Sequence, residues 1–240
     1  MEILFENEEV VVINKPAGML VHDDGSGDNE TVVSWVMKTY PEISEVGEDV
    51  AVRTGEVIKK PGIVHRLDKE TTGALIIAKT QEVFEHLKEQ FQEHTIKKTY
   101  HAFVYGNIKE EDGEIDRPIG KSKSDFRMWS AQRGARGTLR EAQTSFKVVQ
   151  RTESGEVTFL ELYPKTGRTH QIRVHLKAIH HPVIADTLYA PKGERLLGFE
   201  RLALHARNIA FHTPQGGDVS VEAPYPVDFK EAIAQIKSLC

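Results

Sequence analysis

The feature that most constrains the fold is a short apolar run, residues 74–78 (ALIIA), which directly follows a charged segment. Gly73 and Lys79 bound this run on its two sides. A continuous apolar stretch of this length is typical of a β-strand that is buried on both faces. The chain should therefore build a sheet with this strand in its interior.

The charged segment before this strand, residues 65–70 (HRLDKE), contains the first candidate for chemistry. Asp68 is flanked by Arg66 and Lys69 and lies just before the start of the predicted strand. A carboxylate at the edge of a rigid element is where a scaffold holds a catalytic group in place. A solvated charged loop is the alternative interpretation.

Length and composition restrict the class of protein. The chain has 240 residues and ordinary apolar and charged fractions, so it can bury a substantial core and form one domain over residues 1–240. No window approaches the length of a membrane span, and residues 1–10 lack the features of a signal peptide. Cys240 is the only cysteine, which excludes a disulfide framework and a thiolate metal site. We expect a cytoplasmic protein.

The net charge of −5 argues weakly against nucleic-acid binding, but the distribution of charge matters more than the sum. Residues 117–140 carry seven basic side chains and one acid, Asp125. Residues 163–177 carry four basic side chains and no acid. The chain is thus acidic overall with two locally basic segments.

The residue pattern predicts an α+β fold without regular alternation of strands and helices. Helices are expected over residues 31–40, from an N-cap at Thr80 to about 93, from a cap at Thr169 to 180, and over 227–239. Residues 42–60 show no periodicity and read as a long connection, either a functional lid or a surface insertion. Besides 74–78, strands are expected over residues 10–13, 97–105, 126–131, 142–150, 157–163, 202–205, 208–212 and 219–223.

The sequence lacks several common motifs of catalytic and ligand-binding sites. There is no glycine-rich phosphate loop, no HExxH motif and no calcium loop. The eleven histidines lack cysteine or carboxylate partners at ligand spacing, so surface histidines are favoured over a metal site. Residues 25–27 (GSG) lie in a polar loop, without the strand and helix that a hydrolase serine elbow requires.

Four blocks in order along the chain resemble the motifs of RluA-type pseudouridine synthases. The block around Asp68 (HRLD, then TTG and the apolar run) is similar to the family signature. The other three are residues 14–18 (NKPAG) with Val21 and His22, residues 98–100 (KTY), and residues 165–176 (KTGRTHQIRVHL) with Asp186 after them. The matches run from about residue 3 to 223.

The resemblance implies an α+β catalytic fold on a mixed, largely antiparallel sheet with a central cleft flanked by helices. It also implies a monomeric enzyme that isomerises uridines in ribosomal or transfer RNA to pseudouridine, without metal or organic cofactor. Many relatives carry a small RNA-binding domain ahead of the catalytic one, whereas this chain begins almost at its first strand. We therefore expect insertions of the catalytic domain to recognise the target.

By this resemblance, Asp68 is the catalytic carboxylate, acting either as a nucleophile on the ribose or in glycal formation. A cation beside it would keep it ionised, and the motif match assigns that cation to Arg173. A phosphate contact or a surface charge is the alternative for Arg173. Tyr100 would stack on the uracil and help to remove the proton from carbon 5, with a core tyrosine as the alternative.

The resemblance also implies substrate-binding residues. A uridine in folded RNA must be flipped out, and Arg66 is the candidate to fill its place, with a simple salt bridge as the alternative. His65 belongs to the same block, and we expect it to pack inward with Leu67. Contacts to phosphate are assigned to Lys15, Lys165 and Arg168. In the basic segment, Arg127, Trp129 and Arg133 combine cationic and stacking character, as single-stranded RNA sites do, although a solvated basic loop is the alternative.

Two other classes of function compete with this hypothesis. One is an RNA-binding protein or chaperone that retains the fold without the chemistry. The other is a hydrolase that cleaves nucleosides or glycosides, which would release free base or sugar. The presence of Asp68, Tyr100 and Arg173 at matching positions favours the isomerase.

Overall fold

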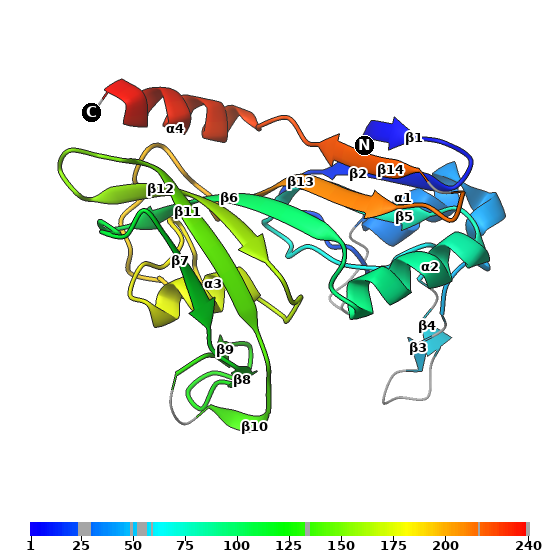
Figure 1. The fold of residues 1–240 in the computed structure, drawn as a ribbon, viewed down its shortest axis with the longest axis horizontal. Helices are drawn as coiled ribbons and strands as arrows, with labels where there is room; N and C mark the ends of the chain where they lie inside the picture. Colours follow the sequence, from blue (N-terminus) through cyan, green and yellow to red (C-terminus); the bar gives the residue numbers. More distant parts are fainter. Residues whose placement is uncertain are drawn as a thin grey trace. The chain divides into compact units, whose positions relative to one another are not determined.

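The computed structural model describes residues 1–23, 30–48, 50–51, 57–58, 60–132, 135–215 and 217–238. The fold is α+β, with a mixed sheet and few helices (Figure 1). The chain forms two compact units, each built from two stretches of sequence. The first contains residues 1–97 and 206–224, and the second contains residues 98–205 and 225–240. The expectation of a single domain over residues 1–240 stays a prediction.

The first unit is organised around β5 (Thr72–Ala78), the apolar run of the sequence. All seven residues of β5 are buried, as expected for an interior strand. Neighbouring strands pair in the order β1 (Glu2–Glu6), β2 (Val10–Lys15), β5, β13 (Leu204–His212) and β14 (Asp218–Glu222). The pairs β1–β2, β2–β5 and β13–β14 are antiparallel.

Gly73 in β5 is required by close packing of two backbones. A Cβ atom at this position would lie 2.2 Å from the carbonyl oxygen of Ala206, and the residue has a φ of +113°. Both conditions exclude other residues. The glycine of the TTG sequence therefore lets β5 lie directly against β13.

The helices of the first unit begin where the sequence predicts. Thr31 caps α1 (Val32–Thr39) in a reciprocal capping box with Ser34. Thr80 caps α2 (Gln81–Gln92), because its hydroxyl accepts a hydrogen bond from the Val83 N–H at 3.3 Å. Short elements occupy the described part of residues 41–58, namely η1 (Pro41–Ile43), β3 (Val50–Ala51) and β4 (Val57–Ile58).

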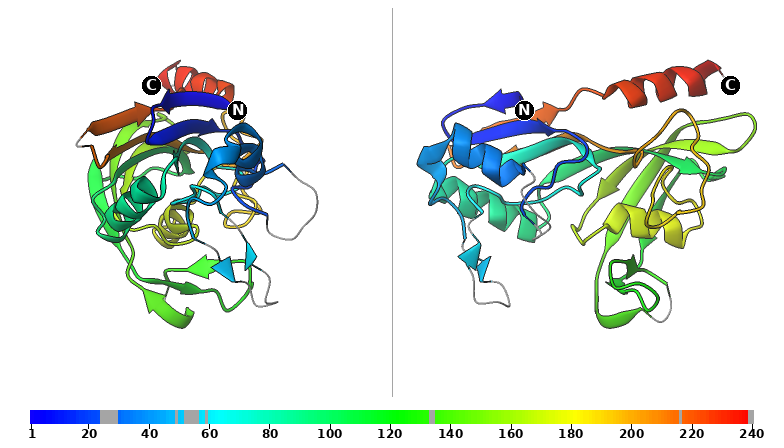
Figure 2. Two further views of the ribbon diagram at one scale, coloured as in Figure 1. Left: turned by 90° about the vertical axis from the view of Figure 1, so that its right-hand side faces the viewer. Right: turned by 180° about the vertical axis from the view of Figure 1, so that it is seen from behind.

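The second unit contains an antiparallel sheet in the order β6 (Lys97–Tyr105), β12 (Val157–Pro164), β11 (Gln143–Arg151) and β7 (Asp112–Asp116). Helix α4 (Val227–Ser238) covers it, with the ring of Phe229 5.5 Å from that of Phe103. A small sheet, β10 (Arg136–Arg140), β8 (Ile119–Lys121) and β9 (Trp129–Ser130), lies at the end of this unit away from α4 (Figure 2).

Two expectations about local structure were wrong, and several strands were not predicted. Only residues 129–130 of the strand expected over 126–131 are extended, because Asp125 accepts the Arg127 N–H and closes a turn. The two strands expected over 202–205 and 208–212 form the single strand β13. The strands β1, β3, β4, β7, β8 and β10 were not predicted.

The histidines also differ from expectation, since two of them are fully buried. His175 and His205 each have a relative exposure of 0%. His175 donates from Nε2 to the Arg117 carbonyl at 3.0 Å and accepts from the Thr144 hydroxyl at 2.9 Å, when the ring takes the tautomer that satisfies both contacts. Burial lowers its pKa. The described residues include no helix long and apolar enough to cross a membrane, and no group of three metal-ligating side chains.

Candidate active site

The Asp68 loop, residues 61–71, is tied to its surroundings along its length. At its start, the Ala78 N–H donates to the Gly62 carbonyl at 2.9 Å, which aligns the loop with the end of β5. At its end, the Thr71 N–H donates to the Asp68 carbonyl at 3.1 Å. Leu67 is buried and Asp68 is half-buried. The loop thus holds Asp68 at a defined position between a buried leucine and a closed turn.

Lys15 has a different environment from the one that a phosphate contact suggests. Its side chain leaves the end of β2 and is fully buried. The ammonium group donates to the carbonyl oxygens of Pro16 at 2.8 Å, Met19 at 2.8 Å and Lys69 at 3.0 Å. The Lys69 carbonyl also accepts from the Gly18 N–H at 3.0 Å. Lys15 therefore connects the NKPAG turn to the residue that follows Asp68.

His65 anchors the other side of the loop. Its Nε2 accepts a hydrogen bond from the Ile76 N–H of β5 at 2.9 Å. Its ring stacks on Phe91 of α2 with centroids 4.8 Å apart. A nitrogen that accepts from a backbone amide carries no proton, so this contact requires neutral His65. Leu67 is buried, as expected, whereas His65 is half-buried with its ring against Phe91.

Arg66 points away from the core. It is exposed, and its Nη1 lies 3.3 Å from Nε2 of His22, the histidine of the N-terminal block. The first unit therefore contains Lys15, His65, Arg66 and Asp68 on two adjoining turns. Two of them are held inside and one guanidinium is presented outside, two residues from Asp68.

Helix α3 (Gln171–Ala178) carries Arg173 in the second unit, but Thr169 does not cap it. The residue before the helix is His170, which has a left-handed conformation with a φ of 56°. The side-chain oxygen of Gln171 accepts from the Arg168 N–H at 3.0 Å and from the Thr166 hydroxyl at 2.6 Å. The expected cap is wrong because this glutamine, inside the helix, closes the preceding turn in its place.

Arg173 forms a buried bidentate ion pair with Asp186. Its Nε donates to Asp186 Oδ2 at 2.7 Å and its Nη2 to Oδ1 at 2.8 Å. The same Oδ1 accepts from the backbone N–H groups of Leu188 and Tyr189, at 3.0 and 2.9 Å. The Tyr189 ring then lies 4.9 Å from the guanidinium carbon. The carboxylate and the ring together fix the direction of the Arg173 side chain.

Tyr100 lies in β6, opposite Leu162 of β12, and is partly buried against the core of the second unit. Lys98 precedes it by two residues, on the same face of the strand. The Lys98 ammonium lies 3.4 Å from the Thr166 carbonyl. Burial lowers the pKa of Lys98 to about 8, so this lysine titrates at mildly alkaline pH.

The remaining predicted phosphate contacts lie before α3. Lys165 is exposed directly after β12. Arg168 is half-buried, and its Nε donates to the Glu141 carbonyl at 2.9 Å. The second unit thus contains Tyr100, Lys165, Arg168 and Arg173. Their cooperation with the four residues of the first unit stays a prediction.

Comparison with known proteins shows the family. Residues 9–178 match the family described as RNA pseudouridylate synthase. A protein of Synechocystis sp. named as an RNA pseudouridine synthase is 35% identical over 238 residues, 99% of this chain and 69% of the relative. The chain belongs to the RNA pseudouridylate synthase family. The resemblance to RluA-type enzymes is therefore confirmed, and the protein is an isomerase that acts on RNA.

Two further relatives support membership of the pseudouridylate synthase family. Ribosomal large subunit pseudouridine synthase D of Nitrosomonas europaea is 34% identical over 247 residues, 100% of this chain and 66% of the relative. The solved structure of human RNA pseudouridylate synthase domain containing 1 superposes with a TM-score of 0.72 at 26% identity. The superposition covers 94% of this chain and 83% of the human chain.

Sequence reasoning missed the part that Asp186 and Tyr189 play around Arg173. In the sequence, Asp186 is only a residue that follows the C-terminal block. Its side chain is fully buried, yet it lies among turns where an aspartate is usually solvated. The one available signal is its place in an otherwise apolar stretch, residues 182–186 (PVIAD), which suggests a buried carboxylate in need of a cation.

Proposed function

We propose that this enzyme isomerises specific uridines of ribosomal RNA to pseudouridine, with Asp68 as the catalytic carboxylate. The construction of the Asp68 loop supports this assignment. Lys15 and Gly18 bind the carbonyl of the next residue, His65 is fastened to β5, and the Thr71 N–H closes the turn on Asp68. A loop fixed at so many points can hold one carboxylate in the geometry that a reaction needs.

The reaction breaks the bond between ribose carbon 1′ and uracil nitrogen 1, turns the base, and forms a bond from carbon 1′ to carbon 5. Carbon 5 loses a proton and nitrogen 1 gains one, so the composition of the RNA is unchanged. A carboxylate can either attack carbon 1′ or stabilise the positive charge that develops on the ribose. Asp68 acts in one of these two ways in our proposal.

Tyr100 and Arg173 carry the other catalytic roles. Tyr100 stacks on the uracil and assists removal of the proton from carbon 5. Arg173 supplies positive charge that favours ionised carboxylates. The bidentate pair with Asp186 supports a positional role for Arg173, because a planar guanidinium held at two nitrogens keeps a fixed orientation.

Arg66 fills the space left by the flipped uridine. Its exposed guanidinium, on the same loop as Asp68, supports this role, because arginine can both stack on bases and donate hydrogen bonds to them. His65, Lys15, Lys165 and Arg168 shape the substrate-binding surface in this proposal. For Lys15 the shaping is indirect, through the Lys69 carbonyl.

Ribosomal RNA is preferred as the substrate because relatives from Nitrosomonas europaea and Zymomonas mobilis are named ribosomal large subunit pseudouridine synthases. Mapping pseudouridines in cellular RNA with and without the protein tests this choice. Loss of sites from transfer RNA alone would overturn it. We further expect a cytoplasmic monomer, and light scattering on the purified enzyme tests its oligomeric state.

Replacing Asp68 by asparagine tests the catalytic assignment. RNA that carries tritium at carbon 5 of uridine should release label with the wild-type enzyme, and Asp68→Asn should slow release by at least about 10³-fold. Asp112→Asn, the same change at an exposed carboxylate of β7, is the control and should act like wild type. Equal release by Asp68→Asn contradicts the assignment, and free uracil among the products would indicate a hydrolase.

A further inference from the structure

The second unit contains a cavity that none of the catalytic roles uses. It lies between helix α3 and residues 122–128, which connect β8 to β9 and which we call the β8–β9 loop. The cavity has a volume of about 100 Å³. One water molecule needs roughly 10–15 Å³ of such space, so the cavity has room for several waters or one small planar group. Its lining residues are Ser122, Ser124, Met128, Trp129, Ser130, Ala131, Gln132, Val174, Lys177, Ala178 and Tyr189.

Two aromatic rings and two apolar side chains form the walls. Met128 comes from the β8–β9 loop and Trp129 from β9, and both pack against the cluster that contains Val174 of α3 and Tyr189. The backbone N–H of Trp129 donates to the Tyr189 hydroxyl at 3.0 Å. This hydrogen bond joins the small sheet to the turn that contains Asp186. Trp129 is the ring on which a base can stack, because it is partly exposed and every nucleobase has a π-face, whereas the Tyr189 ring is buried beside Arg173.

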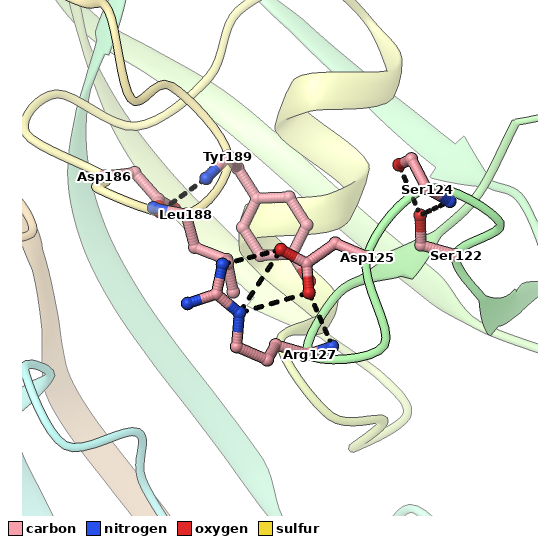
Figure 3. A network of polar contacts seen from close by, with 7 residues as sticks. All are labelled: Ser122, Ser124, Asp125, Arg127, Asp186, Leu188 and Tyr189. Atoms are coloured by element: carbon pink, nitrogen blue, oxygen red, sulfur yellow. Dashed lines mark hydrogen bonds and ion pairs between the residues drawn. The ribbon is translucent and has the colours of Figure 1, made fainter.

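The rim of the cavity offers groups that can bind the edge of a base. The hydroxyls of Ser122 and Ser124 lie 3.0 Å apart (Figure 3). Ser130 accepts the Gln132 N–H at 3.2 Å, and the Gln132 amide is exposed. Hydroxyls and amides both donate and accept, so they can match the donor and acceptor pattern of a base.

Cations surround this rim. The Lys121 ammonium lies 4.1 Å from the centre of the Trp129 ring, and that of Lys177 lies 5.7 Å from the centre of the Tyr189 ring. All five residues of β10, with Arg136 and Arg140 at its ends, are exposed. The one acid of residues 117–140, Asp125, is bound to Arg127. The surface around the cavity is therefore positive, as a site for a phosphate chain requires.

An exposed aromatic side chain stands at the tip of the β8–β9 loop. Phe126 is 85% exposed, more than any other large hydrophobic side chain among the described residues. The Ser122 N–H donates to the Met128 carbonyl at 3.0 Å and closes the loop beneath it. Phe126 lies between Ser124 and Met128, two residues that line the cavity, and its exposed ring can stack on a base.

We propose that this cavity receives one unstacked base of the RNA, that the surrounding cations bind the adjoining phosphates, and that Phe126 stacks on the next base. The proposal rests on the proposed function, since it takes RNA as the substrate. Its occupant is a nucleotide of the substrate RNA other than the target uridine, and the site thereby contributes to the choice of target. The small volume and the positive rim favour a single nucleotide of single-stranded RNA over an uncharged metabolite.

Tryptophan fluorescence can test this directly. The chain has two tryptophans, Trp35 and Trp129, so Trp35→Phe leaves the cavity ring as the sole reporter. The probes are ten-nucleotide oligouridylate, oligoadenylate and an abasic ribose-phosphate chain of equal length. The two base-carrying probes should quench Trp129, whereas the abasic chain should bind through phosphate with little quenching.

Two variants of the Trp35→Phe protein extend the test. Ala131→Phe should fill the cavity and weaken binding of the base-carrying probes by about tenfold. Its matched control is Ala234→Phe, on an exposed position of α4. Phe126→Ala changes only an exposed side chain, so it preserves the fold and should weaken the same probes severalfold while the abasic chain binds as before.

Equal quenching by all three probes, or unchanged affinity in both Ala131→Phe and Phe126→Ala, would overturn the proposal. Tritium release is measured separately on the wild-type enzyme. Release of label without base-dependent quenching would refute the cavity and leave the isomerase intact. Quenching without release would refute the isomerase as proposed while supporting the RNA site.

Discussion

Two of the arginine–aspartate pairs in the second unit, Arg173–Asp186 and Arg127–Asp125, have similar geometry and opposite surroundings. Arg173 and Asp186 lie 13 residues apart in sequence, and their side chains are 10% and 0% exposed. Arg127 and Asp125 lie two residues apart, with side chains 65% and 24% exposed. The first pair fastens a helix to a turn in the interior. The second shapes only its own loop and leaves the guanidinium on the surface, so one region is rigid and the other is open to a partner.

The two regions meet at Tyr189, which contacts both the small sheet and the turn at Asp186. Figure 3 shows Tyr189 beside Leu188 in that turn. Its N–H donates to Asp186, its ring lies over Arg173, and its hydroxyl accepts the Trp129 N–H from the small sheet. The hydroxyl also lies 2.9 Å from Nδ1 of His170, at the start of α3. A proposed catalytic arginine and a proposed base-binding cavity thus share one buried tyrosine.

Removing the buried carboxylate should give the largest effect on stability. Asp186→Asn leaves Arg173 buried without a full counter-charge, so the free energy of unfolding should fall by about 3–5 kcal/mol. Urea denaturation measures this change. The matched change on the exposed loop, Asp125→Asn, should leave the urea midpoint unchanged, because solvent screens exposed pairs.

Enzyme kinetics should also distinguish the two ion pairs. Asp186→Asn should also lower the turnover number while RNA affinity changes less, since Arg173 loses its orientation rather than its charge. Asp125→Asn should do the reverse and alter affinity alone. Equal stability losses in the two variants would show that burial does not separate the two pairs.

Lys98 provides a second test of burial. Its pKa is about 8 in the folded protein and 10.5 in the unfolded chain, so the unfolded chain binds more protons between these values. The free energy of unfolding should therefore rise with pH, by about 2 kcal/mol between about pH 7.5 and 9.5. The range ends there because Tyr40 and Tyr163 have pKa values raised to about 12, and their titration opposes the rise at higher pH.

Lys98→Met should abolish this rise, because it removes the buried titrating group. Lys97→Met, at the exposed neighbouring position, should retain it. Urea denaturation at several pH values measures both variants. A rise that persists in Lys98→Met would assign the effect to another group.

The sequence predicted the longer elements that carry a strong apolar pattern. The apolar run of β5, the stripe of α2 after Thr80 and the bounds of β6 all appear where expected, but burial does not alternate along β6, because Ala102, Phe103 and Val104 are all buried. The sequence pattern did not predict the small sheet, because β10 is exposed on both faces and β8 has only three residues. Neither strand shows a regular alternation of buried and exposed residues that a sequence pattern could record.

For the candidate site, too, the sequence predicted positions but not contacts. Motifs placed Asp68, Arg66 and Arg173 on loops and a helix as expected, but they could not reveal what holds each side chain. The motif predicts that Lys15 contacts phosphate, whereas in the structure its ammonium group donates to three carbonyl oxygens. The pattern predicts Thr169 as a cap, but the residue before α3 is His170, which has a left-handed conformation and makes no side-chain cap. Such contacts depend on residues that are distant in sequence or on local competition, and a single sequence records neither. Arg133 and part of residues 42–60 lie outside the described residues.

The smallest expected effect concerns the exposed cations of β10. Arg136→Gln with Arg140→Gln should weaken binding of single-stranded RNA and reduce the slope of log affinity against log salt by about 1.4, roughly 0.7 for each phosphate that is no longer neutralised. Fold stability should not change, because both side chains are exposed. The control is Lys230→Gln with Lys237→Gln, on exposed positions of α4. Equal slopes in the two double variants would mean that the small sheet is a solvated basic surface, and that only the buried pair of the comparison has a functional partner.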